Sequence, residues 1–424
     1  MKHLFVLFCF LITSIYASGQ SGHAVVPRHQ QITTGLDPEK VTIQLINTIP
    51  AASRNKADSY TDGGHWLILW NIVCEAFVAW LFLFGGISPY IKRLANKTAN
   101  KNTSNLIYIV LYIFINLLIM LPFDLYQNFI RERQYGFSNQ DLVQWLSGEL
   151  ITIFIEAIIL APIFMLIYAV FRRVKENWWA WGGAISIIII VGAVIIYPVF
   201  IGPALNKYTP LKDGALKDQL LSMARANQAN IDRVYVYNES LQTTQFNANV
   251  SGFAGTARIS LNDNMLNNCT NSEIKAVLAH ETAHYVLNSP FVLAAEFGLL
   301  TLIGFRLVKW VFDKLIRRWG AKWQISGIQD VTSLPLLVFL LMFYFFVITP
   351  VSNTVIRTGE VQADLYGLNA AREPDGLVSF IVKSADYNKI APGYWEEIIF
   401  FDHPCRKTRI LTAMKWKAEN SWDF

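Results

Sequence analysis

The sequence of 424 residues has little charge and little cysteine. Charged residues make up only 16% of it and hydrophobic residues 53%, a balance too apolar for an ordinary soluble domain of this size. The cysteines lie far apart, which excludes a CxxC metal site and gives no sign of a disulfide framework. The net charge of +5 comes from short basic clusters beside apolar runs, not from one basic patch interleaved with aromatic residues, so no nucleic-acid partner is expected. The composition instead predicts a lipid bilayer as a partner.

Long apolar runs indicate several membrane-spanning helices. Six of them approach or exceed the roughly 18 residues that a span requires. By this rule they cover about 66–90, 105–124, 149–171, 178–202, 291–312 and 334–350. A shorter run, Leu4 to Tyr16, follows a lysine and ends in small residues, which is typical of a secretory signal; an uncleaved short anchor is the alternative. The pattern predicts a mainly α fold, a multi-pass transmembrane helical bundle.

Basic residues lie in alternate connections between these runs. They cluster around 92–101, 172–175 and 306–322. Because Lys and Arg are enriched in cytoplasmic loops, all three connections are expected on the cytoplasmic side. The segment from about 19 to 64, the stretch 203–290 and the tail from 351 should then lie on the extracytoplasmic side, by the same rule.

The polar stretch 203–290 has the pattern of a small α+β domain inserted into the bundle. Val234–Val236 and Ile259–Leu261 are typical of short strands flanked by Asn, Asp and Gly. Thr270 and Glu273 form a capping-box pattern, which predicts that a helix begins there and continues into His280.

That predicted helix carries the HExxH pattern, with His280, Glu281 and His284. The i, i+4 spacing places both imidazoles on one helical face, where they can hold one metal ion, with Glu281 beside them as a general base. A surface helix without metal is the alternative, because so short a pattern also arises by chance.

A second helix could complete a metal site. A catalytic zinc ion takes three protein ligands, so a third must come from elsewhere in the chain. Glu360 and Asp364 follow the last apolar run at i, i+4 spacing, which suggests Glu360 as a ligand and Asp364 as the partner of a ligating histidine. A solvated helix face is the alternative for this pair. We therefore expect one Zn²⁺ per chain, held by His280, His284 and Glu360.

Together these motifs resemble the type I CAAX prenyl protease family, membrane HExxH zinc metallopeptidases of the gluzincin type, in a bacterial-like member. The resemblance covers nearly the whole chain after about residue 65 and includes three further segments. They are Phe84–Ile87, Leu121–Gln127 and Asn206–Leu211. The chain departs from the family's usual residues at Thr282, Ala283 and Asn249, positions where substrate preference could change.

The resemblance also implies roles for other residues. Asn247 and Ala248 would belong to an edge strand that binds the substrate backbone. His403 would stabilise the oxyanion, with Arg409 as its support. The partner would be a peptide or protein substrate, including lipid-modified or membrane-bound ones, although the extracytoplasmic site argues against prenylated substrates.

The predicted organisation has six parts. They are 1–19, a signal peptide or short anchor; 20–64, an extracytoplasmic segment; 65–202, four transmembrane helices; 203–290, the metallopeptidase domain with the HExxH helix; 291–350, two transmembrane helices; and 351–424, the rest of that domain with the ExxxAD helix.

The sequence thus predicts a multi-pass membrane zinc metalloendopeptidase that uses zinc-activated water, with its active site on the extracytoplasmic side. A quality-control protease for membrane proteins is the alternative within the same class. A channel or receptor with a structural zinc ion is the alternative from another class, but structural sites usually have four protein ligands, often cysteines, and no cysteine is near either motif.

Overall fold

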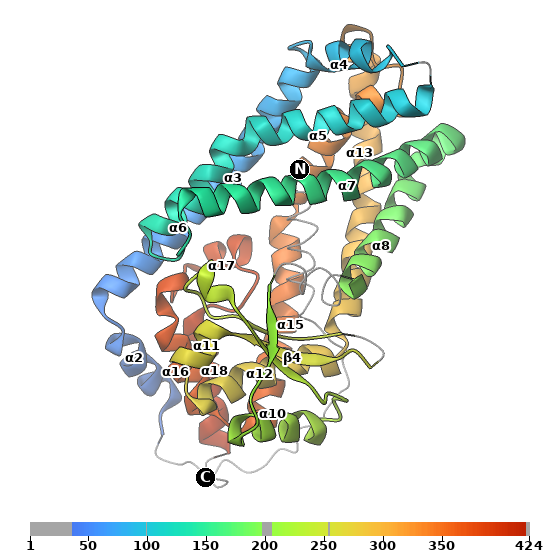
Figure 1. Cartoon of the computed structure of the whole chain (residues 1–424). Helices are drawn as coiled ribbons and strands as arrows, with labels where there is room; N and C mark the ends of the chain where they lie inside the picture. Colours follow the sequence, from blue (N-terminus) through green and yellow to red (C-terminus); the bar gives the residue numbers. More distant parts are fainter. Residues whose placement is uncertain (1–35, 99, 197–205, 253–254, 421–424) are drawn as a thin grey trace.

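The computed structural model describes residues 36–98, 100–196, 206–252 and 255–420. The expected signal peptide or anchor at 1–19 lies outside the described residues. Long helices fill one end of the molecule, and a small domain with a sheet lies at the other end (Figure 1). The predicted class, a mainly α helical bundle with an inserted small α+β domain, is confirmed.

The bundle contains long apolar helices. Four described helical tracts are long and apolar enough to cross a membrane, and a fifth span results if one bent helix pair is counted as one. One of these four tracts, Leu142 to Ala193, consists of two helices, because the chain folds back at Lys175–Asn177. The bundle helices are α3 (Ala51–Leu83), α5 (Lys101–Leu125), α7 (Leu142–Val174), α8 (Trp178–Ile196), α13 (Ser289–Trp323) and α14 (Leu334–Val347).

Several helices differ in length from the apolar runs. Helix α3 begins at Ala51 instead of near residue 66, and α13 continues to Trp323 instead of ending near 312. Both extensions are polar turns, which hydropathy does not detect even though the backbone remains helical. The other described helical segments near the bundle are α4 (Ile87–Ala95), η1 (Tyr126–Ile130), α6 (Arg131–Gln134), η2 (Lys175–Asn177) and η5 (Val331–Ser333).

The three basic connections lie at the same end of the bundle. Lys92 forms an ion pair of 2.9 Å with Asp330, and Lys309 lies 3.4 Å from Glu176. The first pair joins α4 to the loop between α13 and α14, and the second joins the turn between α7 and α8 to α13. The inserted domain lies at the opposite end (Figure 1).

The small domain has a four-stranded sheet in the order β1-β2-β4-β3. Strands β2 and β4 are parallel, and the other two pairs are antiparallel. The strand predictions at Val234 and Ile259 are confirmed as parts of β2 and β4. The strands are β1 (Tyr208–Pro210), β2 (Val234–Tyr237), β3 (Ala248–Ser251) and β4 (Arg258–Asn262).

Helices from distant parts of the sequence cover this sheet. The core between them contains Leu220, Ile259, Leu261 and Leu278. The helix α2 before the first apolar helix packs on α18, so residues of the expected N-terminal segment belong to this domain. Its helices are α2 (Pro38–Thr48), α10 (Ala215–Ala226), η4 (Glu239–Leu241), α11 (Asp263–Asn268), α12 (Asn271–Val286), α15 (Thr349–Ala371), α16 (Pro374–Lys383), η6 (Ala385–Tyr387), α17 (Tyr394–Phe400) and α18 (Arg406–Glu419).

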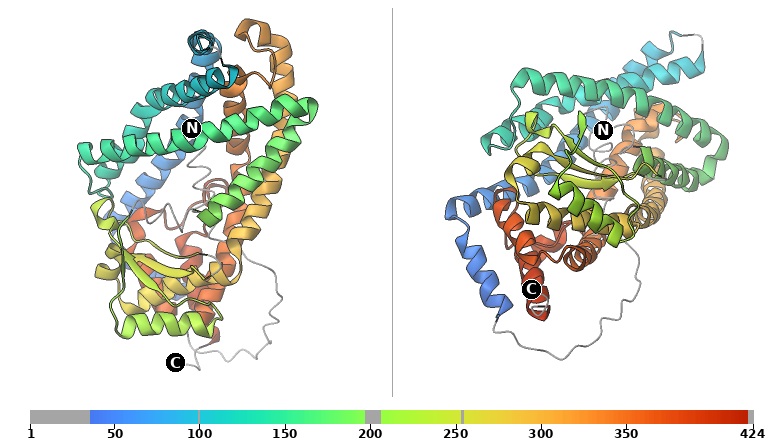
Figure 2. Two further views of the ribbon diagram at one scale, coloured as in Figure 1. Left: turned by 45° about the vertical axis from the view of Figure 1, so that its right-hand side comes forward. Right: turned by 60° about the horizontal axis from the view of Figure 1, so that its bottom comes forward.

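Two of these helices continue directly from bundle helices. Helix α12 leads into α13 through Asn288, which has a left-handed backbone. Helix α15 follows α14 after a bend of 57°. Figure 2 shows α13 packed beside α8 on the way from the domain to the far end of the bundle.

Candidate metal centre and active site

Helix α12 begins at the predicted capping box. The Thr270 hydroxyl accepts from the Glu273 backbone N–H, and the Glu273 carboxylate accepts from the Thr270 N–H. Burial raises the pKa of Glu273, but hydrogen bonds from Lys383 and Ser379 outweigh it and lower the pKa below its ordinary value. These contacts fix the start of α12 and therefore the direction of its histidines.

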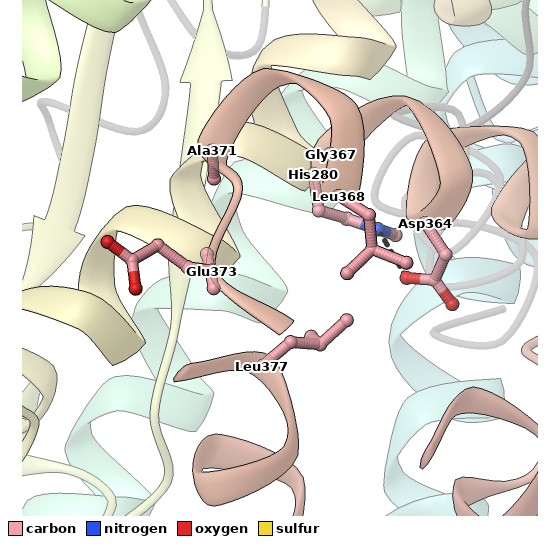
Figure 3. Close-up of a pocket in the computed structure, with 8 residues that line it drawn as sticks. His280, Asp364, Gly367, Leu368, Ala371, Glu373 and Leu377 are labelled. Atoms are coloured by element: carbon pink, nitrogen blue, oxygen red, sulfur yellow. Dashed lines mark hydrogen bonds and ion pairs between the residues drawn. The ribbon is translucent and has the colours of Figure 1, made fainter. Parts of the chain in front are cut away.

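Close contact between α12 and α15 brings the two motifs together. A Cβ atom added at Gly367 would lie 3.0 Å from the backbone nitrogen of His280, so a larger residue would force the two helices apart by a few tenths of an ångström. Figure 3 shows His280 and Asp364 pointing toward each other beside a small pocket that Leu368, Ala371 and Leu377 also line.

The side chains of His280, His284 and Glu360 form a compact buried group. The Nε2 atoms of the two histidines are 3.1 Å apart, and Glu360 oxygens lie 3.1 Å from Nε2 of His280 and 3.7 Å from Nε2 of His284. Two ligands of a tetrahedral zinc ion, each about 2.0–2.1 Å from the metal, lie about 3.3 Å apart. The three side chains therefore have the spacing that such an ion requires.

The chemistry of the donors also fits a cation. The buried Oε2 atom of Glu360 accepts no hydrogen bond of good geometry in the described part of the chain, although Nε2 of His280 and Nε2 of His403 lie 3.1 and 3.3 Å away. The Nε2 atoms of the two histidines face each other beside the Glu360 carboxylate, so their lone pairs point into one small space that suits a cation. Buried polar atoms without partners are rare in folded proteins, and a metal ion would satisfy all three donors.

Asp364 links this group to α18. Its Oδ1 atom lies 2.9 Å from Nδ1 of His280, and its two oxygens accept hydrogen bonds of 2.8 and 2.6 Å from Arg409. Burial lowers the pKa of His280, but Asp364 and Glu360 together raise it to about 10. The Asp364 carboxylate thus keeps a proton on Nδ1 of His280 and directs its Nε2 toward His284 and Glu360.

Glu281 is half-buried beside these residues. Burial raises its pKa to about 7, and the carboxylate of Glu360 acts in the same direction. A carboxylate with a pKa near neutrality can both accept and return a proton.

His403 reaches the group from the loop after α17. Its Nε2 atom lies 3.3 Å from Oε2 of Glu360, and its Nδ1 atom lies 2.8 Å from Asp402. The side chain is 47% exposed, so it borders solvent on one side. Partial burial lowers its pKa, but Glu360 and Asp402 raise it above the ordinary value. Arg409 donates two hydrogen bonds to Asp364, and its expected support of His403 stays a prediction.

The residues that hold the His403 loop were not predicted from the sequence. Arg357 donates a 2.9 Å hydrogen bond to the Glu397 carbonyl and another to the Phe401 carbonyl. The ring of His65 on α3 stacks on Phe400 at 4.0 Å between centroids. Arg357 precedes Glu360 by three residues, so its position on the same predicted helix could have indicated a role near the site.

The expected substrate-binding residues lie at the edge of the sheet. The backbone carbonyl of Asn247 accepts from Asn262, and β3 is the last strand, packed against α12. Since antiparallel pairs alternate, the N–H and C=O groups of Ala248 and Val250 point away from β4. This edge can pair with a further strand.

A second group of possible ligands is different in character. Asp62, His65 and Glu396 lie within 4.8 Å of one another. The Lys389 ammonium group lies 3.0 Å from both carboxylates and balances their charge. We therefore interpret this cluster as an ionic link between α3 and α17.

Two family models match almost all of the described chain. The model described as the CAAX prenyl protease N-terminal region with five membrane helices matches residues 33–207, and the model of peptidase family M48 matches residues 210–417. The chain belongs to the M48 CAAX prenyl protease family. It is accordingly an integral, multi-pass membrane peptidase.

Individual relatives of this family are similar over most of their length. An uncharacterized metalloprotease, YhfN of Bacillus subtilis, is 27% identical over 364 residues, 85% of each chain. The human CAAX prenyl protease 1 homolog is 25% identical over 409 residues, 84% of this chain and 83% of the human protein. The crystal structure of Ste24p from S. mikatae has a similar fold, with a TM-score of 0.72, 22% identity, and coverage of 97% of this chain and 96% of that one.

Proposed function

We propose that this chain is a zinc metalloendopeptidase that holds one Zn²⁺ with His280, His284 and Glu360. The observation that carries the proposal is the spacing of these three buried donors, which suits a tetrahedral ion and leaves its fourth position open. A structural zinc site, as in the alternative of a channel or receptor, usually has four protein ligands. The three ligands proposed here therefore favour a catalytic site.

The residues around the three donors have distinct roles in the proposed reaction. When bound, zinc would supply the Lewis acidity that makes water nucleophilic near neutral pH and polarises the scissile carbonyl. Glu281 accepts a proton from the attacking water and returns it to the leaving amine. His403 donates a hydrogen bond to the negative charge that develops on the carbonyl oxygen. Asp364, held by Arg409, keeps His280 in the tautomer whose Nε2 can bind the metal.

The substrate would bind as an added strand along β3. Backbone groups of Ala248 and Val250 point outward, and an extended peptide gains main-chain hydrogen bonds there without regard to most of its side chains. Asn247 precedes this edge strand, and Asn249 lies within it. The name of the human relative refers to a CAAX prenyl protease, so we propose a protein or peptide substrate, including lipid-modified or membrane-bound ones.

We further propose that 203–290 and 351–424 form the main part of the peptidase unit, separated by the membrane hairpin 291–350. The basic connections at the far end of the bundle support an extracytoplasmic position for the active site. The two parts share a core with α2, so the peptidase unit includes residues before the first membrane helix as well.

The decisive experiment compares variants of the proposed base and of a ligand. Purified Glu281→Gln should keep zinc and its melting temperature but lose cleavage of casein or a peptide, because only proton transfer is removed. Glu360→Ala should lose both zinc and activity. Glu419→Gln, an exposed acid at the end of α18, is the control and should behave as the wild type. Wild-type cleavage by Glu281→Gln would contradict the mechanism.

A further inference from the structure

The exposed face of α13 changes in character along the helix. Large apolar side chains occupy it first, and basic side chains follow. The exposed apolar residues are Phe291, Leu299, Ile303, Leu307 and Trp310. The exposed basic residues that follow are Lys314, Arg317, Arg318 and Lys322, which we call the α13 basic face. Arg306 interrupts the apolar part, with its guanidinium over the Trp179 ring.

The length of the apolar part matches a bilayer. With a rise of 1.5 Å per residue, Phe291 to Trp310 covers about 28 Å, close to the roughly 30 Å hydrocarbon thickness. Lys314 to Lys322 therefore lie beyond the hydrocarbon, at the level of the lipid headgroups. Tryptophans mark this boundary, as expected at membrane interfaces.

An independent helix reaches the same level. The exposed stripe of α3, from Trp66 to Trp80, continues to Phe84 at the end of that helix. The Phe84 ring packs on Trp319 at 5.6 Å, and the Lys322 ammonium group lies 5.2 Å from the Phe84 ring. The lipid-facing surfaces of α3 and α13 thus end together beside the basic face.

The four charges of this face have no acidic partner among the described residues. The nearby carboxylates already pair with other lysines: Asp313 and Glu176 with Lys309, and Asp330 with Lys92. Aromatic rings provide the contacts that the basic face does make. Lys314 lies 3.5 Å from the Trp310 ring centroid, and Arg318 lies 5.2 Å from that of Trp319. An anionic partner outside the chain would balance this charge.

We propose that the α13 basic face binds the headgroups of anionic phospholipids. It is continuous with the lipid-facing surface, lies at headgroup depth and carries four unbalanced positive charges, and clusters of four to eight Lys or Arg at the end of a membrane helix are typical of such binding. The site lies at the opposite end of the molecule from the metal centre, so it can be tested separately from the peptidase function.

The test measures lipid affinity on the full chain in a neutral detergent. Short-chain phosphatidylglycerol is added, and its apparent Kd is taken from the rise in melting temperature, with phosphatidylcholine and inorganic phosphate in parallel. We expect a rise with phosphatidylglycerol but not with inorganic phosphate, since the bound headgroup is held by its acyl chains as well. Changing the four basic residues to Gln should increase the Kd at least tenfold, because each basic residue contributes about fivefold near an anionic surface.

A matched variant controls for net charge. It replaces four exposed basic residues at the other end, Lys40, Lys212, Arg225 and Lys415, by Gln and should keep the wild-type Kd. The proposal would be overturned if both variants lost affinity equally, or if the basic-face variant kept it. It would also be overturned if this variant changed the oligomeric state, since the face would then be a contact between copies. Unchanged zinc content in both variants verifies that the fold is intact.

Discussion

Replacement of Asp364 by Asn tests the proposed role of this buried carboxylate at the candidate metal site. In the wild type, Asp364 accepts from His280 at 2.9 Å and from Arg409 at 2.8 and 2.6 Å. The amide has nearly the same shape but no charge. Partners of metal-binding histidines typically contribute 10- to 100-fold to metal affinity, or about 1.4–2.7 kcal/mol. We therefore expect Asp364→Asn to weaken zinc binding by this factor.

The same substitution should also destabilise the fold through Arg409. Loss of one partner of a buried ion pair costs about 3–5 kcal/mol, and because the Arg409 side chain is 20% exposed we expect about 2–3 kcal/mol here. The double variant Asp364→Asn/Arg409→Gln removes both charges. It should regain much of the stability but not the zinc affinity, since His280 still lacks the carboxylate.

Two measurements separate these effects. Competition with a chelator gives the zinc dissociation constant, and denaturant unfolding of the metal-free protein gives the free energy of unfolding. If Asp364→Asn bound zinc within twofold of the wild type, Asp364 would not orient His280. If the double variant recovered both properties, the loss of zinc affinity would follow from instability alone.

Other predictions address the active site, the domain and the topology. His403→Ala should lower kcat and kcat/KM by about 100- to 1,000-fold with zinc content unchanged, whereas a structural role would lower the melting temperature instead. Arg357→Gln should also lower kcat, because Arg357 holds the His403 loop, and Arg357→Lys should lower it less. Both kcat and zinc content would be measured on the same preparation. The lowered pKa of Glu273 stabilises the fold above about pH 4.5, so the melting temperature should fall as the pH drops below this value, and less in Glu273→Gln. Reporter fusions at Thr98 should be active only for a cytoplasmic reporter, and those after Asn238 only for an external one.

Local patterns were the part of the structure that the sequence could predict. The capping box at Thr270 and the strand around Val234 depend on neighbouring residues, and both are present. The start of α3 was missed because hydropathy reports where a helix is apolar, not where it is helical. Ala51 to His65 form polar helical turns, and their stability depends on contacts with η6 far along the chain.

Contacts between distant segments could not be predicted from spacing. The family resemblance implied a role for Arg409 beside His403, but no spacing in the sequence indicated that Arg409 on α18 donates hydrogen bonds to Asp364 on α15. The stacking of His65 on Phe400 joins residues from opposite ends of the chain, and no local pattern announces it. Such pairs depend on how the helices pack against one another, and the composition of a single segment does not determine this packing.

The connections of the helices that carry His280, His284 and Glu360 explain why the candidate metal site lies at the end of the bundle. His280 and His284 are on α12, which continues into α13, and Glu360 is on α15, which continues from α14. If side chains from α12 and α15 held one ion, that ion would fix the distance between the α12–α13 connection and the α14–α15 connection. The candidate metal site therefore depends on the membrane hairpin as well as on the small domain, and a change in the packing of α13 against α14 would be transmitted to the three side chains through the short breaks at Asn288 and Ile348.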